Sequence, residues 1–378
     1  MTLFKNISQQ QFINEVWQKK PLVFEQAFSD IAGLIDGNDL AGIACESDAE
    51  SRIISGHDLN GEWQCQQGPF TAKDFAKLAE NNWTLLVQGL DQWDDQVRTV
   101  LEQFNFLPKW RLEDIMASYA PPGGGVGPHF DYYDVFLIQA SGTREWQLGQ
   151  QCDHNTALQD NDQVKLLAKF DSQQTHQIHA GDMLYIPAGL AHWGAATTDD
   201  CITLSVGFRA PSHNEILIQS LELLIEQLSK QEHSDRYKDS PESIDSHPFK
   251  INQHIGKSLP ALEVQAQTNI SLTEQAFGRL VTEQRYVSDA EIQDWDANKL
   301  AQSLEDNPRC ELIHDTSARF AFTESHLFVN GEAFEASEPF SKMVCSGLIE
   351  RELNVGELRV VLTLLSEGSV QIKDSVKS

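Results

Sequence analysis

The sequence has little of what marks several large protein classes. Basic residues are scarce, since 28 Lys and Arg stand against 56 Asp and Glu in 378 residues, a formal net charge of −28. This balance disfavours direct binding to nucleic acid or to an anionic membrane, and it suits a basic partner. No apolar run approaches the roughly 20 residues of a transmembrane helix, and the first residues do not read as a signal peptide. We therefore expect a cytoplasmic protein that is not inserted in a membrane.

Cysteine patterns that would indicate disulfides or zinc are also missing. The six cysteines are scattered along the chain, and no two of them form a C-x-x-C pair. In a chain of this length such cysteines are expected to be free thiols in a reducing compartment. The sequence shows no internal repeat and no low-complexity tract, and it is long enough for two or three domains.

What the sequence does contain is a central region of short strand-like segments. The stretch RLEDIMASYA (111–120) reads as a strand, and CITLSVGFR (201–209) alternates apolar with polar or small residues. Turn residues recur between these segments, and there is no alternation of strands with helices. This pattern predicts a closed or sandwich-like β-structure preceded by shorter helical segments.

The pattern changes after Pro211 to helical spacing. One apolar stripe runs along the segment NEILIQSLELLIEQLSKQ, through Leu217, Leu221, Leu224 and Leu228. A stripe of this kind predicts an amphipathic helix, and we expect it to form a homodimer contact. The alternative is that the stripe packs on the chain's own barrel. A polar stretch from Glu232 to His247 reads as a linker, and Asn330-Gly331 predicts a tight hairpin turn further on.

The chemistry concentrates in two segments about 60 residues apart. A glycine-rich turn leads to His129 and Asp131, which would point to the same side if they lay on a strand. In the second segment, Pro187 and Gly189 predict a turn that presents His192. Either segment alone could be an ordinary surface pair. Together they match the two halves of the cupin signature, with Asp in place of one His, and they predict the two-His, one-carboxylate triad that suits Fe(II).

Arg144 is the next candidate, because REWQLG places it on the same strand face as Trp146 and Leu148. If that face is the barrel interior, the guanidinium needs an anionic partner, and a dicarboxylate co-substrate would supply one. The alternative is an outward-facing surface pair. His176 and His179 also have a spacing that could fit a metal, but on a strand they would point to opposite faces, so we interpret them as non-ligands.

Three segments carry a family resemblance: GGGVGPHFDYYDVFLIQ (123–139), GDMLYIPAGLAHWG (181–194) and SVGFRAP (205–211). They closely resemble the JmjC-type 2-oxoglutarate oxygenases, and more narrowly the bacterial ribosomal oxygenases of the YcfD (RoxA) type. The final Asn of the general cupin pattern is replaced by Ala196, a position that is not a ligand in the oxygenases.

The resemblance implies a mainly β fold with added α-structure. Its catalytic domain would be a double-stranded β-helix, the cupin or JmjC barrel, over residues 1–211. A helical dimerisation region over 212–286 and a C-terminal winged-helix-like domain over 287–378 would follow. Because acidic residues outnumber basic ones in this last part, we expect no phosphate-binding face there.

The resemblance also implies an activity, hydroxylation of the β-carbon of an arginine in protein sixteen of the large ribosomal subunit. It implies that Fe(II) is held by His129, Asp131 and His192. It implies that 2-oxoglutarate, used with O2, is bound by Arg144 and Ser118. It implies that the pocket for the substrate arginine is lined by Asp114, Met116, Tyr133 and Ser205. The residues themselves agree on Asp114, since a carboxylate beside a thioether suits a guanidinium with an aliphatic stem.

Two alternatives stay open at this point. One is a JmjC hydroxylase that acts on a histidine of another ribosomal protein. The other is a cupin that binds a metal without being an oxygenase, although such cupins usually present a third imidazole where Asp131 stands.

Overall fold

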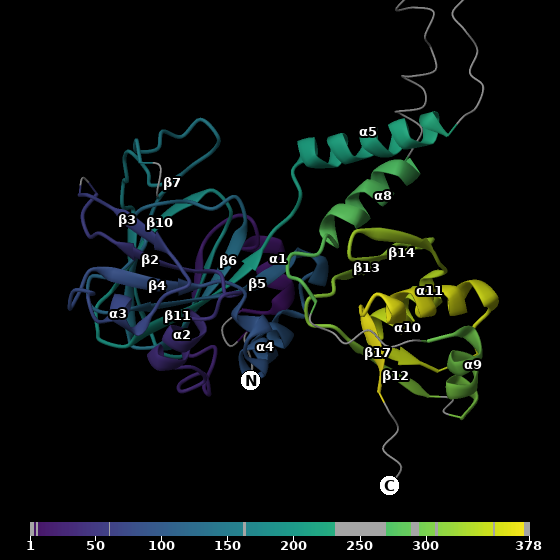
Figure 1. Ribbon diagram of the computed structural model, residues 1–378. Helices are drawn as coiled ribbons and strands as arrows, with labels where there is room; N and C mark the ends of the chain where they lie inside the picture. The colour runs from purple at the N-terminus through teal and green to yellow at the C-terminus, as the bar shows by residue number, and fades with distance from the viewer. Residues whose placement is uncertain are drawn as a thin grey trace, which may run out of the picture. The chain divides into compact units, whose positions relative to one another are not determined.

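The computed structural model describes residues 4, 7–59, 61–161, 164–230, 270–288, 295–306, 309–350 and 352–373. The chain divides into two compact units, Met1–Ala210 and Pro211–Ser378 (Figure 1). The polar stretch from Glu232 to His247 lies outside the described residues. The predicted boundary at residues 286 and 287, within the second unit, stays a prediction.

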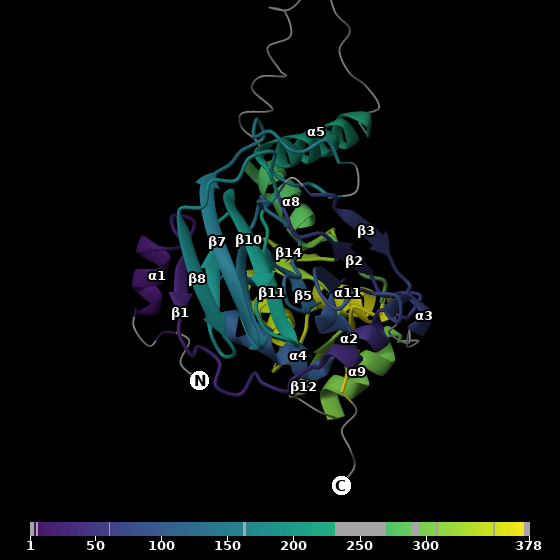
Figure 2. The same ribbon diagram turned by 90° about the vertical axis from the view of Figure 1, so that its left-hand side faces the viewer.

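The first unit contains two antiparallel sheets. The larger has eight strands, in the spatial order β1 (Leu22–Phe24), β9 (Met183–Ile186), β6 (Asp134–Ser141), β11 (Cys201–Phe208), β5 (Leu112–Ala120), β4 (Trp83–Val87), β2 (Ser51–Ser55) and β3 (Gln64–Gln67). The smaller has the order β10 (Leu190–Ala196), β7 (Thr143–Gln151) and β8 (Gln174–His179), and it lies in front of the larger sheet in Figure 2.

The two sheets share an apolar interior. Side chains of β6 and β9 on one side meet side chains of β7 and β8 on the other, in a cluster of Val135, Leu137, Trp146, Leu148, Ile178, Leu184 and Ile186. These residues alternate with outward-facing ones along each strand, which is the pattern of a sheet that closes on itself. The predicted mainly β barrel is confirmed.

Short helices surround this barrel. Their bounds are α1 (Gln9–Glu15), α2 (Gly37–Ile43), α3 (Ala72–Phe75), η1 (Leu90–Gln92), α4 (Asp95–Arg98), η2 (Thr99–Phe104) and η3 (Lys109–Arg111). α1 begins with a capping box at Ser8 and buries Phe12, whose ring meets that of Tyr185 edge-on at 5.2 Å. Phe136 of β6 contacts the same two rings, so α1 packs on the larger sheet through aromatic side chains.

The second unit combines helices with two small antiparallel sheets. The helices are α5 (His213–Ser229), α8 (Ile270–Val281), α9 (Ala297–Asp306), α10 (Glu338–Ser346) and α11 (Val355–Ser366). One sheet has the order β16 (Leu348–Ile349), β12 (Cys310–His314), β17 (Val370–Ile372), and the other the order β13 (Phe320–Phe322), β14 (His326–Val329), β15 (Glu332–Glu335). The hairpin turn predicted at Asn330-Gly331 is confirmed, with φ of 50° and 83° at the two positions.

The apolar stripe of α5 differs from the prediction at one position. Leu224 is buried and packs with Leu272 and Ala276 of α8, so it is not available for the homodimer contact expected of the stripe. Leu217, Leu221 and Leu228 of the same stripe are exposed. Ile218 and Ile225 extend this exposed face, because a helix returns to the same side every three or four residues. Among the described helices, none is long and apolar enough to cross a bilayer.

Candidate active site

The glycine-rich segment reaches the site without forming the strand predicted for it. β6 begins only at Asp134, so His129 and Asp131 precede it in an irregular segment. His129 instead forms an isolated bridge with His192: the His129 N–H donates to the His192 carbonyl at 3.0 Å, and the His129 carbonyl accepts from the His192 N–H at 2.8 Å. The Asp131 carbonyl accepts from the Gly189 N–H at 2.7 Å. Backbone pairing between distant segments, not the strand period, therefore brings the three side chains together.

Glycine makes this close pairing possible. A Cβ at Gly125 would lie 2.2 Å from the carbonyl oxygen of Gly194, and one at Gly127, where φ is +79°, would lie 2.6 Å from Leu166. Real side chains do not tolerate such distances, so only glycine lets the segment run against β10. The glycines thus allow a close backbone approach, whereas the sequence had suggested a sharp turn into a ligand strand.

The three predicted metal ligands converge on one point. The Asp131 Oδ2 lies 3.9 Å from His129 Nε2 and 3.6 Å from His192 Nε2. All ligand atoms of the group lie within 4.8 Å of one another, and it is the one group of three potential metal-binding side chains within the described residues. Such a cluster leaves one side of a metal ion open to other ligands.

Both imidazoles are fixed in the tautomer that a metal needs. The Nδ1 of His129 lies 2.9 Å from the Gly127 carbonyl oxygen, and the Nδ1 of His192 lies 2.9 Å from the Leu190 carbonyl oxygen. A carbonyl can only accept, so each Nδ1 carries the hydrogen and each Nε2 presents a lone pair. Burial lowers the pKa of His192 to about 4, and the neighbouring His129 adds to this. His192 is therefore neutral at pH 7, the state that binds a metal.

Arg144 lies inside the barrel, as its alternation with Trp146 predicted. It is 3% exposed, and its Nε and Nη2 have no hydrogen-bond partner among the described residues. Its Cζ lies 5.8 Å from the centre of the Trp146 ring, and that ring lies 5.8 Å from the ring of His192. An unpaired guanidinium is costly to bury, so the site fits an anionic group placed between Arg144 and the metal ligands.

Trp146 is a further candidate ligand-binding residue, although its sequence position indicated only an apolar neighbour of Arg144. Its Nε1 is buried and has no hydrogen-bond partner among the described residues. Its six-membered ring fills the space beside Gly194, where a Cβ would lie 2.7 Å from ring atoms. The signal that could have identified it is its place two residues from Arg144, since both then point to the interior.

Tyr133 links the predicted substrate residues to the triad, since the charges of Asp131 and Asp114 both act on its hydroxyl. Burial raises the pKa of Tyr133, and the charges of Asp131 and Asp114 add to this, while Arg52 acts in the opposite direction. Tyr133 therefore stays protonated at neutral pH, and both carboxylates are near its hydroxyl. Asp114 is 3% exposed.

Met116, Ser118 and Ser205 take neighbouring positions on two paired strands. Met116 of β5 is opposite Ser205 of β11 and packs against the cluster around Ile54 and Leu86. The buried Ser118 hydroxyl donates to the Thr203 carbonyl at 3.4 Å. The structure thus brings the predicted substrate residues to one side of the barrel, whereas the role of Ser118 toward a co-substrate stays a prediction.

His176 and His179 lie away from this cluster on β8. The Nδ1 of His179 is 3.2 Å from the Thr143 hydroxyl, and His176 contacts Gln174. Neither belongs to the group of converging ligand atoms.

Comparison with known proteins agrees with this geometry. Residues 99–216 match the JmjC domain family. The chain is 34% identical over 284 residues to the ribosomal protein uL16 3-hydroxylase of Escherichia coli K12, covering 74% of this chain and 72% of that protein. It is 38% identical over 214 residues to a probable ribosomal oxygenase of Haemophilus influenzae, covering 56% of this chain and 52% of the relative.

Solved structures extend the likeness to nearly the whole chain. The X-ray structure of E. coli YcfD aligns with a TM-score of 0.81 and 27% identity, over 97% of this chain and 99% of that one. The same E. coli ribosomal oxygenase in complex with cobalt and 2-oxoglutarate aligns with a TM-score of 0.78 and 27% identity, over 98% and 99% of the two chains. The chain therefore belongs to the JmjC-domain ribosomal oxygenases, the family that includes the E. coli uL16 3-hydroxylase.

Proposed function

We propose that this protein is an Fe(II)- and 2-oxoglutarate-dependent oxygenase that hydroxylates the β-carbon of an arginine in ribosomal protein uL16. The observation that carries the proposal is the His129–Asp131–His192 cluster with the unpaired Arg144 near it. The name of the E. coli relative supports the substrate, and the cobalt and 2-oxoglutarate in its structure support the cofactors. Carbon 3 of an amino acid is its β-carbon, which gives the position of the hydroxyl.

The triad residues would hold the iron through Nε2 of each histidine and a carboxylate oxygen of Asp131. Bound together with 2-oxoglutarate and O2, iron supplies the oxidation of an unactivated C–H bond, with succinate and CO2 as the other products. The Arg144 guanidinium would pair with the far carboxylate of 2-oxoglutarate in bidentate geometry. The Trp146 Nε1–H would add a neutral donor, and Ser118 is retained as a further candidate ligand. Burial of His192 and Arg144 keeps water away from these contacts.

The substrate side of the proposal rests on charge and shape. The buried Asp114 carboxylate would pair with the arginine guanidinium, while Met116 and Tyr133 would flank its aliphatic stem and Ser205 would border it. The net charge of −28 would attract a basic ribosomal protein over a distance set by the salt concentration. Because ribosomal proteins are made in the cytoplasm, this substrate supports a cytoplasmic location. Family membership in the oxygenases removes the alternative of a non-oxygenase cupin.

We also propose that the protein forms a homodimer through the exposed face of α5. This face consists of Leu217, Ile218, Leu221, Ile225 and Leu228, and the last of these is the least exposed at 37%. A row of large apolar side chains along 17 residues of helix is costly to leave in water. A second copy of the same helix would cover it with the same chemistry.

The metal assignment predicts that Asp131→Ala abolishes turnover while the protein stays folded. One of three protein ligands is lost, and we expect Co(II) affinity to fall by at least about 10-fold. Co(II) titration followed by its visible absorption, with circular dichroism for folding, measures both effects. His176→Ala is the matched control, because it removes a histidine outside the cluster. Full activity in Asp131→Ala would refute the triad.

The co-substrate assignment predicts that Arg144→Lys weakens 2-oxoglutarate binding by roughly 10- to 100-fold. A lysine keeps the charge but loses the bidentate fork, and a hydrogen bond to a charged group contributes about 1.5–3 kcal/mol. Trp146→Phe should weaken binding less, since it removes one neutral donor. Calorimetric titration of the Zn(II)-loaded proteins avoids turnover. Unchanged affinity in Arg144→Lys would mean that another group holds the carboxylate.

The substrate assignment predicts that Asp114→Asn loses most hydroxylation of an arginine peptide from uL16 while keeping metal and 2-oxoglutarate affinity. The neutral amide cannot form a charge-assisted pair with the guanidinium, and a loss of about 100-fold is expected. Mass spectrometry of the peptide, compared with the same peptide carrying Lys and with a histidine peptide, reports the added oxygen. Equal use of the Arg and Lys peptides would favour the histidine-hydroxylase alternative.

The assembly assignment predicts that the double variant Leu221→Glu, Ile225→Glu sediments as a monomer while the parent protein sediments as a dimer. Two charges in the middle of an apolar contact have no partners and must stay hydrated. The control is Gln219→Glu with Gln227→Glu, which adds the same charge at polar positions outside the apolar face. Leu224 is left unchanged because it packs on α8. A parent protein that is already monomeric would contradict the proposal.

A further inference from the structure

The strand that carries Asp114, β5, loses one of its two neighbouring strands near that residue, while its pairing with β11 continues. β4 pairs with β5 from Leu85 opposite Tyr119 to Val87 opposite Ala117, and the pairing stops there. The chain then turns through Gly89, whose φ of 61° lies in the left-handed region, into the short helix η1. The backbone N–H groups beyond this point need other acceptors, because they are buried.

Two buried carboxylates replace the missing ladder in a reciprocal way. Asp114 of β5 accepts the Gly89 N–H at 3.1 Å, and Asp91 of η1 accepts the Ile115 N–H at 2.8 Å. Each acid thus satisfies a backbone donor of the opposite segment. Asp91 is 4% exposed and Asp114 3%, so both bonds lie out of water.

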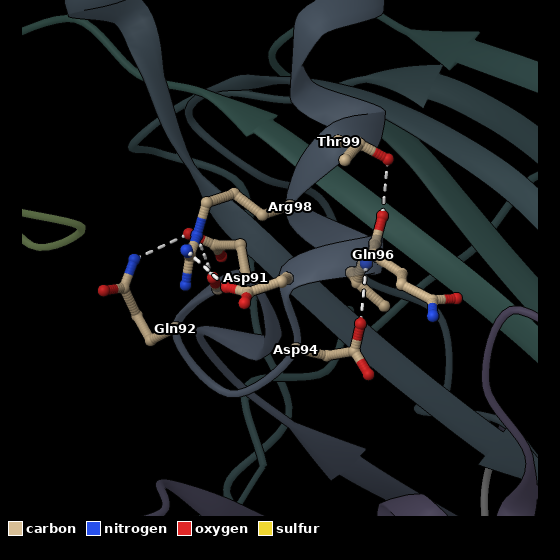
Figure 3. A network of polar contacts seen from close by, with 8 residues as sticks. Asp91, Gln92, Asp94, Gln96, Arg98 and Thr99 are labelled. Carbon is tan, nitrogen blue, oxygen red and sulfur yellow. Dashed lines mark hydrogen bonds and ion pairs between the residues drawn. The ribbon is translucent and has the colours of Figure 1, made fainter. Parts of the chain in front are cut away.

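Each carboxylate also receives the amide of one glutamine. Gln88 Nε2 donates to Asp114 Oδ2 at 2.7 Å, the same oxygen that accepts from Gly89. Gln92 Nε2 donates to Asp91 Oδ2 at 2.8 Å. Figure 3 shows Gln92 and Arg98 converging on Asp91, where the Arg98 Nε donates to the Asp91 carbonyl at 2.7 Å. Asp91 is therefore held in η1 by contacts that do not involve Gln88.

The two glutamines have the same chemistry but serve different acids. Gln88 donates to Asp114, the acid whose charge acts on Tyr133, whereas Gln92 donates to Asp91, the acid of η1 that accepts from the Ile115 N–H. Two donors on one oxygen fix the plane of the Asp114 carboxylate. A bidentate pair with a guanidinium depends on that plane, while an ammonium group, as a point charge, does not.

We propose that Gln88 is a positioning residue, which orients the Asp114 carboxylate and so determines selection of arginine over lysine. The inference rests on the proposed arginine hydroxylase function. It assigns no contact between Gln88 and the substrate. The competing interpretation is that Gln88 only stabilises the end of β4, and Gln92 provides the comparison that separates the two.

The test compares Gln88→Met with Gln92→Met in the full-length protein loaded with Fe(II). Methionine keeps the length of the side chain and removes the donor, so neither variant leaves a large cavity. For Gln88→Met we expect KM for the arginine peptide to rise by about 10-fold, the effect of one hydrogen bond to a charged group. The preference for the arginine over the lysine peptide should fall by a similar factor.

Readouts that do not involve the peptide should stay constant. Consumption of 2-oxoglutarate without peptide, and calorimetric 2-oxoglutarate affinity of the Zn(II) form, should match the parent in both variants. Gln92→Met should keep the parent's KM and its arginine preference even if its melting temperature falls as much as that of Gln88→Met.

The outcomes separate this inference from the function on which it rests. If the parent enzyme hydroxylates the arginine peptide and Gln88→Met retains the parent's KM and selectivity, the inference is overturned and the function stands. Equal changes in KM and selectivity in both glutamine variants would also overturn it, in favour of a purely structural role. A parent enzyme that does not use the arginine peptide at all would overturn both.

Discussion

The site depends on one pair of backbone hydrogen bonds, those that join His129 to His192 in both directions. Neither residue's neighbours alone could place the two imidazoles, because the segments are far apart in the chain. The bridge aligns them, and the Gly189 N–H then holds the Asp131 carbonyl on the same edge. The convergence of the three ligand side chains on one point follows from this short stretch of pairing.

Two side chains in the same barrel bury donors that have no hydrogen-bond partner within the part of the chain that the structure describes. The donors of Arg144 and Trp146 lie within one small region that His192 borders. A protein built only for stability would pair such groups or replace them with apolar ones, since each unsatisfied donor costs about 1–3 kcal/mol. Their presence indicates a binding site, because a bound ligand that accepts their hydrogen bonds would remove this cost.

The two proposed binding sites carry opposite charges. Arg144 in the barrel interior would offer a guanidinium to the anionic co-substrate, and Asp114 would offer a carboxylate to the cationic substrate. Burial and the charges of Asp131 and Asp114 raise the pKa of Tyr133, which keeps a neutral donor there. The two ligands are thus distinguished by charge before their shapes are compared.

Much of this could be predicted from the sequence, because it depends on residue types and local spacing. The inward Arg144, the strand that carries Asp114 and the Asn330-Gly331 turn each follow from a pattern within one segment, and the three metal ligands follow from two half-motifs taken together. The strand expected at His129 was wrong, since its glycines serve a close approach to β10 and not a strand. The inclusion of Leu224 in the expected homodimer contact was also wrong, because α8, distant in the chain, covers it. Gln88 had no local signal, since its role arises only where separate segments meet, and the donor of Trp146 had only its place two residues from Arg144. Periodicity is a property of one segment, whereas contacts between segments depend on register and packing, which only the tertiary structure decides.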